Sequence, residues 1–168
     1  MSTTLIHRRR AVSPVIATVI LIAVAVALGI AVAFWASGLT SSFSKYEKLG
    51  VNTQYATGSA STAWTINLGG QNTGSSDATI IQIQINGVPY APNGTSPVVY
   101  TINGGSQNSI SQTPISIPVK SGQSFTITFT LSASSTQVPG KKFTDGQTIQ
   151  VVIITAAGNN YPASIVLP

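Results

Sequence analysis

Few side chains in this sequence could carry out chemistry. Its 168 residues include one histidine, His7, no cysteine, and three acidic residues, Glu47, Asp77 and Asp145. A serine nucleophile needs a base, and His7 lies ahead of an apolar run, in a segment that we expect to be removed. Three scattered acids make neither a carboxylate pair nor a calcium site, and thiolate ligands are absent. We therefore predict no enzymatic activity, no metal and no cofactor.

The basic residues do not follow a nucleic-acid-binding pattern. The formal net charge is +5, but Arg8, Arg9 and Arg10 supply three of these charges immediately before the apolar run. A nucleic-acid-binding face gathers Lys and Arg on a folded surface, often with aromatic residues between them. Only the pair Lys141-Lys142 resembles such a patch, and two lysines are typical of a solvated turn. We predict no nucleic-acid partner.

One modification motif is present, the sequon Asn93-Gly94-Thr95. It lies in a Pro- and Gly-rich loop, where N-glycosylation requires it to be. Such a tripeptide also arises by chance in a chain rich in Asn and Thr, so an occupied and an empty Asn93 both stay open. Only 7 % of the residues are charged, against a usual share of about 25 %. The surface must therefore consist mainly of hydroxyl and amide groups, which suits the outside of a cell and leaves O-linked sugars or plain solvation open.

A long apolar run follows the three arginines. No ionisable side chain occurs between Ala11 and Ser44, and Val15 to Trp35 is almost wholly Val, Ile, Leu and Ala. Its length exceeds the ~18 to 20 residues that cross a bilayer, where helix is the only reasonable state for a single span. Pro14 suits the first position of that helix. The three arginines place its start on the cytoplasmic side and direct the rest of the chain outward.

Three interpretations of this run compete. A secretory signal peptide would be cut after Ala31-Val32-Ala33 and would leave a soluble secreted domain. A permanent single-span anchor would stay intact. A third class of leader is cut before the helix, which then remains with the mature chain. The apolar part exceeds the ~7 to 15 residues of a signal peptide, and it continues through Phe34 and Trp35, which suit a membrane interface.

The string Arg9-Arg10-Ala11-Val12-Ser13-Pro14-Val15-Ile16 closely resembles the processing region of archaeal type IV pilins, in which a basic and a small residue precede the cut. The resemblance extends from Arg8 to Phe43, about a fifth of the chain. It implies cleavage of the Ala11–Val12 bond, with Arg10, Ala11 and Val12 as the processing site. The sequence departs from bacterial pilins, because Ile16 stands where they carry a glutamate, and this departure favours the archaeal branch.

The resemblance also implies a domain organisation and a set of partners. Residues 1–11 would be a prepilin leader that is removed, residues 12–44 a hydrophobic assembly and transmembrane helix, and residues 45–168 an extracellular β-sandwich domain. The implied partners are copies of the same chain in a helical homopolymer, a prepilin peptidase, a pilus assembly ATPase, a membrane platform protein, and the membrane itself before assembly.

After Gly50 the apolar residues recur with the period of two that is typical of half-buried antiparallel strands. The alternating sets are Trp64, Ile66 and Leu68; Ile81, Ile83 and Ile85; and Phe125, Ile127, Phe129 and Leu131. A denser run from Gln150 to Thr155 predicts a strand that is covered on both sides. Asn86-Gly87 is a strong signal for a type I′ hairpin. We predict an α+β chain in which the long N-terminal hydrophobic helix is followed by an all-β Ig-like sandwich of six to eight strands.

The leading hypothesis is the structural subunit of an archaeal type IV adhesion pilus, a filament on the outside of the cell. Surface adhesion is the expected role, and a role as a virus receptor stays open. One alternative is the archaellin of a motility filament, which has the same kind of leader and N-terminal helix. Another is a single-span, membrane-anchored domain that binds glycans or a partner at the surface.

Overall fold

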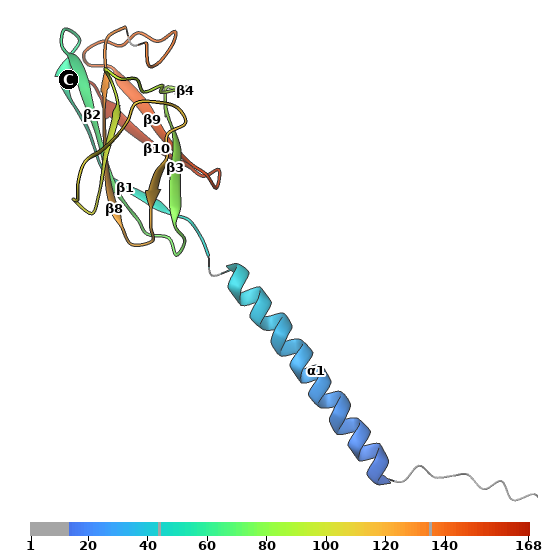
Figure 1. Ribbon diagram of the computed structural model, residues 1–168. Helices are drawn as coiled ribbons and strands as arrows, with labels where there is room; N and C mark the ends of the chain where they lie inside the picture. The colour runs from blue at the N-terminus through green and yellow to red at the C-terminus, as the bar shows by residue number, and fades with distance from the viewer. Residues whose placement is uncertain (1–13, 44, 135) are drawn as a thin grey trace, which may run out of the picture. The chain divides into compact units, whose positions relative to one another are not determined.

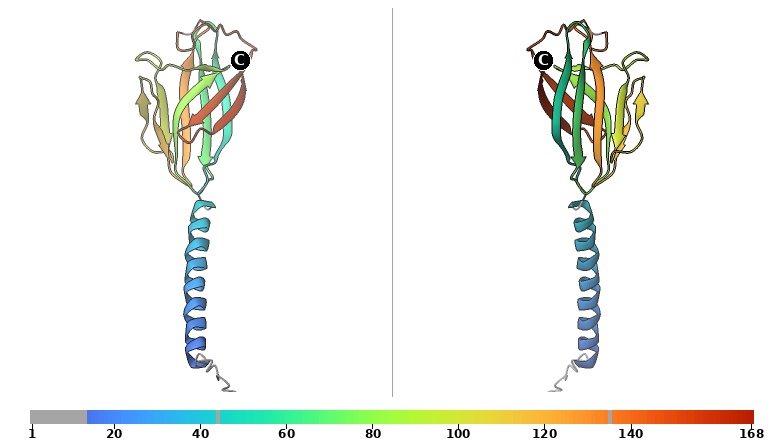
Figure 2. Two further views of the ribbon diagram at one scale, coloured as in Figure 1. Left: turned by 90° about the vertical axis from the view of Figure 1, so that its right-hand side faces the viewer. Right: turned by 90° about the vertical axis from the view of Figure 1, so that its left-hand side faces the viewer.

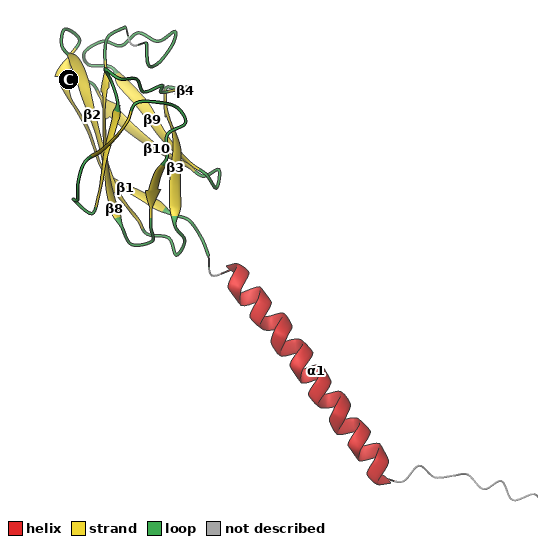
Figure 3. Cartoon of the chain, viewed as in Figure 1, coloured by secondary structure: helices red, strands yellow, loops and turns green. Residues whose placement is uncertain are grey.

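The computed structural model describes residues 14–43, 45–134 and 136–168. The chain divides into two compact units, with the boundary between Ser44 and Lys45. The first unit contains one helix, α1, and the second, which we call the head, contains the ten strands found among the described residues (Figures 1 and 3). The chain therefore has the predicted α+β class, a long apolar helix followed by a β domain.

Helix α1 (Pro14–Phe43) is 30 residues long. Proline at the first helical position costs little, because its missing N–H would have no partner there. Every side chain from Pro14 to Leu39 is exposed. This 26-residue stretch is long and apolar enough to cross a membrane. The predicted helix is confirmed from Pro14 onward, whereas Val12 and Ser13 lie outside the described residues.

The head consists of two antiparallel sheets. Sheet A contains, in spatial order, β1 (Leu49–Ser59), β2 (Ala63–Asn72), β8 (Ser124–Leu131), β5 (Val98–Ile102) and β6 (Asn108–Ile110). Sheet B contains β10 (Asn160–Val166), β9 (Thr148–Thr155), β3 (Ala78–Ile85) and β4 (Val88–Pro89), with β7 (Ile117–Val119) also paired to β3. In Figure 2 the dark red β10 lies in front of sheet A in the left view and behind it in the right view, so the sheets form two layers.

The predicted sandwich is confirmed, but the strand number was underestimated. Six to eight strands were expected, and ten are present among the described residues. The additional strands include β4, β6 and β7, which are only two or three residues long. A period of two cannot be recognised in so few residues, so these strands become visible only through their pairing partners.

The core lies between the sheets and is built from alternate residues of the long strands. On β2, Trp64, Ile66 and Leu68 are all fully buried, as their spacing predicts. On β3, Ile83 and Ile85 are buried as predicted. The remaining buried hydrophobic residues of this cluster also belong to the head. The head therefore has a hydrophobic core to which the helix contributes nothing.

The prediction for Ile81 was wrong. Ile81 is 39 % exposed, whereas its neighbour Ile80 is fully buried. The pairing of β3 with β9 shifts register between Ile80 and Gln82, and this bulge reverses which residues face inward at that end of β3. A bulge inserts one extra residue into a strand and thereby breaks the alternation on which the prediction depended.

The prediction that β9 is covered on both sides was also wrong. Its inner face, which includes Val151 and Ile153, is fully buried, but Val152 and Ile154 are only partly buried on the opposite face. These two residues therefore lie on the outer face of sheet B, where they are only partly covered. A run of four β-branched residues thus lies in a strand with one covered face.

The predicted hairpin at Asn86-Gly87 is confirmed. The φ angles of Asn86 and Gly87 are 49° and 80°, and positive values at both central residues define the type I′ turn. The Asn86 Oδ1 atom accepts the N–H of Gln150 at 2.8 Å, and the Asn86 N–H donates to the Gln150 oxygen at 2.8 Å. The turn is therefore attached to β9 as well as joining β3 to β4.

Tyr90 yields a prediction on the pH dependence of the head. Its ring lies 4.8 Å from the ring of Phe129, and its hydroxyl donates to the backbone oxygens of Thr130 at 3.0 Å and Ser96 at 3.2 Å. Burial raises the pKa of Tyr90 to about 12 from an ordinary 10.0. Because the folded pKa is the higher one, this contribution to stability is complete below pH ~10 and is lost as pH rises toward ~12.

We expect the thermal unfolding midpoint of the head, measured by circular dichroism on the full chain in non-ionic detergent, to fall across that pH window. The Tyr90→Phe variant should be less stable at neutral pH, because two backbone oxygens lose their donor, but its midpoint should depend less on alkaline pH. Tyr55→Phe, at an exposed position, is the matched control and should decline like the parent chain. A decline in Tyr90→Phe as steep as the parent's would contradict the role of Tyr90.

Candidate functional site

The predicted processing site cannot be placed. Arg10, Ala11 and Val12 lie outside the described residues, as does His7. The described candidates are the surface of α1, the junction that begins the head, the sequon at Asn93, and a cleft on the outside of sheet B.

The surface of α1 is apolar all round. Fourteen large hydrophobic side chains between Val15 and Leu39 are each at least 36 % exposed. Its internal hydroxyls bond within the helix, since Thr18 Oγ1 donates to the Val15 oxygen at 2.9 Å and Ser37 Oγ to the Ala33 oxygen at 2.9 Å. The helix thus offers neither charge nor an unpaired described hydroxyl to its surroundings, which is the property of a helix that is buried in lipid or in an assembly.

The head begins with two backbone segments that are tied together, the neck (residues 45–48) and the clamp loop (residues 73–76). Backbone and side-chain donors bridge them along their whole length. The bonds are Thr73 N to Lys48 O (2.8 Å), Gly74 N to Lys48 O (3.2 Å), Thr73 Oγ1 to Lys48 O (3.3 Å), Ser76 N to Tyr46 O (3.1 Å) and Tyr46 N to Ser75 Oγ (3.1 Å). The neck is therefore part of the folded head and not a free linker.

Gly74 allows the neck and the clamp loop to approach this closely. A Cβ atom added at Gly74 would lie 2.5 Å from the nitrogen of Lys48 and 2.5 Å from the oxygen of Tyr46. Both atoms are backbone, so neither can swing away as a flexible side chain would. Only glycine fits here unless the two segments separate.

Asn72 holds the clamp loop in position. Its side chain is fully buried. The Nδ2 group donates to the oxygens of Ser76 at 2.9 Å and Val119 at 3.0 Å, and Oδ1 accepts the N–H of Gly74 at 3.0 Å. A buried amide with these bonds fixes the backbone around it, because each bond would be costly to leave unmade. Asn72 thus connects the neck to the two-sheet core through the clamp loop.

The sequence analysis missed Asn72 and Gly74. Asn72 closes a polar run and Gly74 resembles any turn glycine, so nothing local marks either residue. Two of the three acidic residues, Asp77 and Asp145, bind backbone amides of distant segments. Asp145 Oδ1 accepts the N–H of Ala60 at 2.8 Å, and Asp77 Oδ1 accepts the N–H of Ser121 at 3.0 Å.

A cluster of side chains that could hold a metal ion is not found among the described residues. No three side chains of His, Cys, Asp or Glu come together there. The loop-anchoring bonds of Asp77 and Asp145 explain why each acid lies where it does.

The sequon lies in an ordered turn. Asn93 Oδ1 accepts three hydrogen bonds, from the N–H of Thr95 at 3.1 Å, from Thr95 Oγ1 at 2.8 Å and from the N–H of Ser96 at 2.8 Å. Each of these bonds uses the amide oxygen of Asn93, and none of them uses its Nδ2 nitrogen. The nitrogen is the atom to which an N-linked sugar is attached, so the turn is compatible with a modified Asn93.

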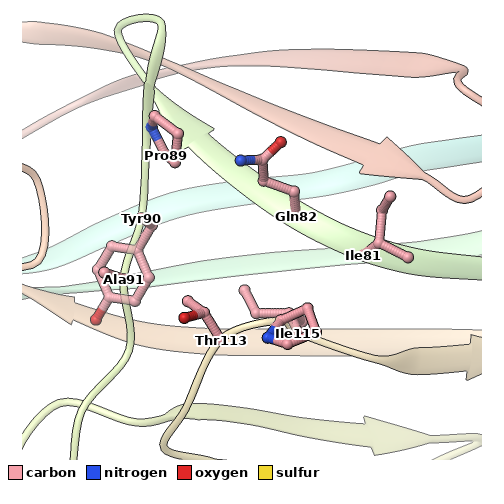
Figure 4. Close-up of a pocket in the computed structure, with 8 residues that line it drawn as sticks. Ile81, Gln82, Pro89, Tyr90, Ala91, Thr113 and Ile115 are labelled. Carbon is pink, nitrogen blue, oxygen red and sulfur yellow. The ribbon is translucent and has the colours of Figure 1, made fainter.

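A cleft of about 280 Å³ lies at the β3–β4 side of sheet B (Figure 4). Its lining comes from β3, from the segment that follows the β3–β4 hairpin, and from the loop before β7. The lining residues are Ile81, Gln82, Pro89, Tyr90, Ala91, Thr113, Pro114 and Ile115. Tyr90 and Ile115 are buried, whereas Ile81, Pro89 and Pro114 are exposed. The lining side chains carry no charge, and they include one amide, Gln82, and one hydroxyl, Thr113, besides the tyrosine.

The clamp gives a prediction at Gly74. We expect Gly74→Ala to destabilise the head by about 1–3 kcal/mol, the usual cost of overpacking, and to speed hydrogen exchange at the amides of Thr73 and Ser76, because the neck must move away. Unfolding of the full chain in detergent and exchange mass spectrometry measure the two effects. Gly94→Ala is the matched control, since a Cβ at Gly94 meets nothing within 4 Å. Equal behaviour of the two variants would show that the close approach at Gly74 is unimportant.

No protein-family model matches the sequence, and no curated protein matches it either. Several solved structures show a remote similarity in fold. One is the archaeal flagellum of Methanospirillum hungatei strain JF1, which is 15% identical in sequence. The alignment covers 91% of this chain and 88% of the flagellum chain, with a TM-score of 0.44. The archaellum periplasmic stator protein FlaG from Sulfolobus acidocaldarius is 15% identical over 71% of this chain and 99% of its own, with a TM-score of 0.39. The Iho670 flagellar-like filament is 17% identical over 92% of this chain and 98% of its own, with a TM-score of 0.34. At these scores the similarities establish no function for this chain.

Proposed function

We propose that this chain is the structural subunit of an archaeal type IV pilus-like filament on the cell surface. In this proposal a prepilin peptidase cuts the Ala11–Val12 bond, and the mature chain stays in the membrane through its helix. Copies of the chain then polymerise through residues 12–44. The observation that carries the proposal is the fully exposed apolar surface of α1, which is preceded in the sequence by the short basic leader.

The energetics of α1 require that its surface be covered. Burying one large aliphatic or aromatic side chain is worth about 1.5–3 kcal/mol. For the fourteen exposed side chains of α1, even the low end amounts to roughly 20 kcal/mol, which exceeds the whole stability of an ordinary domain, about 5–15 kcal/mol. Such a helix is stable in lipid or among its own copies, and it is not stable in water.

Polymerisation is supported by the distribution of small residues along α1. Nine alanines and glycines lie within the helix, and close packing between helices would make use of them. They are Ala17, Ala23, Ala25, Ala27, Gly29, Ala31, Ala33, Ala36 and Gly38. Small residues let helix backbones approach closely. The surface of α1 that faces lipid before assembly can thus pack against other helices after assembly, without any change in the chain.

The head fits the outer coat of such a filament. No strand of the head contains an Asp, Glu, Lys or Arg, so copies can lie side by side without strong electrostatic repulsion. Surface adhesion is the role we propose for this coat. Assembly by a cytoplasmic ATPase and a membrane platform protein completes the proposal.

The N-terminus of the native protein tests the proposal. We expect filaments sheared from cells to contain a chain that begins at Val12, as read by N-terminal sequencing and intact mass. Ala11→Glu should stay uncut and membrane-bound, because the resemblance requires a small residue before the cut, whereas Ala11→Gly is the matched control and should be processed. An intact Met1 on a monomeric membrane protein would instead identify a permanent anchor, and a start near Phe34 a secreted domain. A loss of swimming in cells that lack the chain would identify an archaellin.

We further propose that Asn93 carries an N-linked sugar in the assembled filament. Its nitrogen is free of the bonds that shape the turn, and the proposed topology places the turn outside the cell. We expect a glycan mass on the native chain that is lost in both Asn93→Gln and Thr95→Ala. Thr95→Ser is the control, because serine keeps the hydroxyl of the sequon and should retain the added mass. An unmodified native chain would refute this assignment.

A further inference from the structure

The apolar stretch of α1 is longer than the hydrocarbon core of a bilayer. The 26 residues from Pro14 to Leu39 rise about 39 Å along the helix axis, whereas the core is about 30 Å thick. To fit this whole stretch inside the core, the helix would have to tilt by about 40°, which is the upper limit of the usual range of about 0–40°. A shorter part of α1 therefore matches the membrane better.

The sequence of α1 changes in composition after Trp35. From Val15 to Ala33 every residue is Val, Ile, Leu or Ala, with the exceptions of Thr18 and Gly29. After Trp35 the helix continues as Ala-Ser-Gly-Leu-Thr-Ser-Ser-Phe, in which half of the residues carry a hydroxyl group. Because hydroxyl groups favour water over hydrocarbon, this last part of α1 gains much less from insertion into lipid than the part before it.

Phe34 and Trp35 stand where the composition changes. Their side chains are 76% and 70% exposed, and successive helix positions project about 100° apart at nearly the same height. The Trp64 Nε1 atom donates to the Pro168 oxygen at 3.2 Å, but the indole N–H of Trp35 has no partner among the described residues. An apolar ring with an N–H that needs an acceptor suits the membrane–water interface. The rise from Pro14 to Trp35 is about 33 Å, which crosses the core with a tilt of about 25°, close to the average of about 20°.

We infer that α1 binds the hydrocarbon of a lipid bilayer only as far as Trp35, and that residues 36–43 form a stalk outside it. This inference rests on the membrane-inserted state of the proposed function. Trp35 then lies at the level of the outer headgroups, where its N–H meets oxygen acceptors. The stalk rises about 12 Å and separates the neck from the hydrocarbon core. Extraction of the chain for assembly thus has to free only the part of α1 that precedes the stalk.

The cysteine-free sequence allows a labelling test on the full chain in phosphatidylcholine vesicles. Three single variants, Leu28→Cys, Leu39→Cys and Ser164→Cys, are treated with a maleimide that cannot cross the bilayer. Ser164 is exposed on the head and sets the level of full labelling. We expect Leu39→Cys to reach that level, because residue 39 lies about 6 Å beyond Trp35 along the helix. Leu28→Cys is the matched control and should be labelled only after detergent has dissolved the vesicles.

Tryptophan fluorescence measures the depth of Trp35 directly, in vesicles whose lipids carry bromine at different depths. The chain has two tryptophans, and Trp64 is fully buried in the head, away from lipid. We expect bromines near the headgroup end of the acyl chains to quench the fluorescence more than bromines near the bilayer centre. Trp35→Phe should remove this quenching, because only Trp64 then remains.

Two results would overturn the inference. Protection of Leu39→Cys in intact vesicles would show that α1 is inserted through Leu39, and stronger quenching by the deeper bromines would place Trp35 inside the hydrocarbon. The proposed filament would stand in both cases, because its helices could still leave the membrane from that depth. A parent chain that does not insert into vesicles at all would remove the membrane-inserted state of the proposed function together with the stalk.

Discussion

The exposed surface of α1 is the constraint on which the rest of the molecule depends. From Val15 to Leu39 the helix carries large aliphatic and aromatic side chains on every side and no charge. Water cannot accommodate such a surface, so the chain must always have another environment for it. A head that shares no core with the helix is compatible with this requirement, because the helix can then move between environments while the head keeps its own fold.

The hydrogen bonds between the clamp loop and the neck fix the segment with which the head begins. The buried Asn72 fixes the clamp loop, the loop binds the neck, and Gly74 permits the close approach. Because the clamp bonds run from Tyr46 to Lys48, a force applied to the neck in the proposed filament would be distributed over several hydrogen bonds before it reached β1.

The regular part of the fold could be predicted from the sequence, because local periodicity determines it. The helix and the inward faces of β2 and β8 follow directly from the spacing of apolar residues, and so does the turn at Asn86-Gly87. The errors arose where pairing between strands far apart in the sequence determines which side chains face the core. A bulge against β9 turned Ile81 outward, and Val152 and Ile154 are only partly buried on the outer face of their strand. The Asn72 clamp and the cleft join segments far apart in the chain, and no local pattern contains that information.

The same errors mark the apolar residues on the outer face of sheet B. Ile81, Val152 and Ile154 were expected in the core because they are aliphatic and β-branched, yet the fold keeps them outside. Single exposed aliphatic residues are ordinary on a protein surface. On the outer face of sheet B they alternate with the glutamines at positions 82, 84 and 150, and no strand of that sheet carries a charge. In the proposed filament, contacts between the strands of neighbouring heads would therefore depend on shape and hydrogen bonding and not on charge.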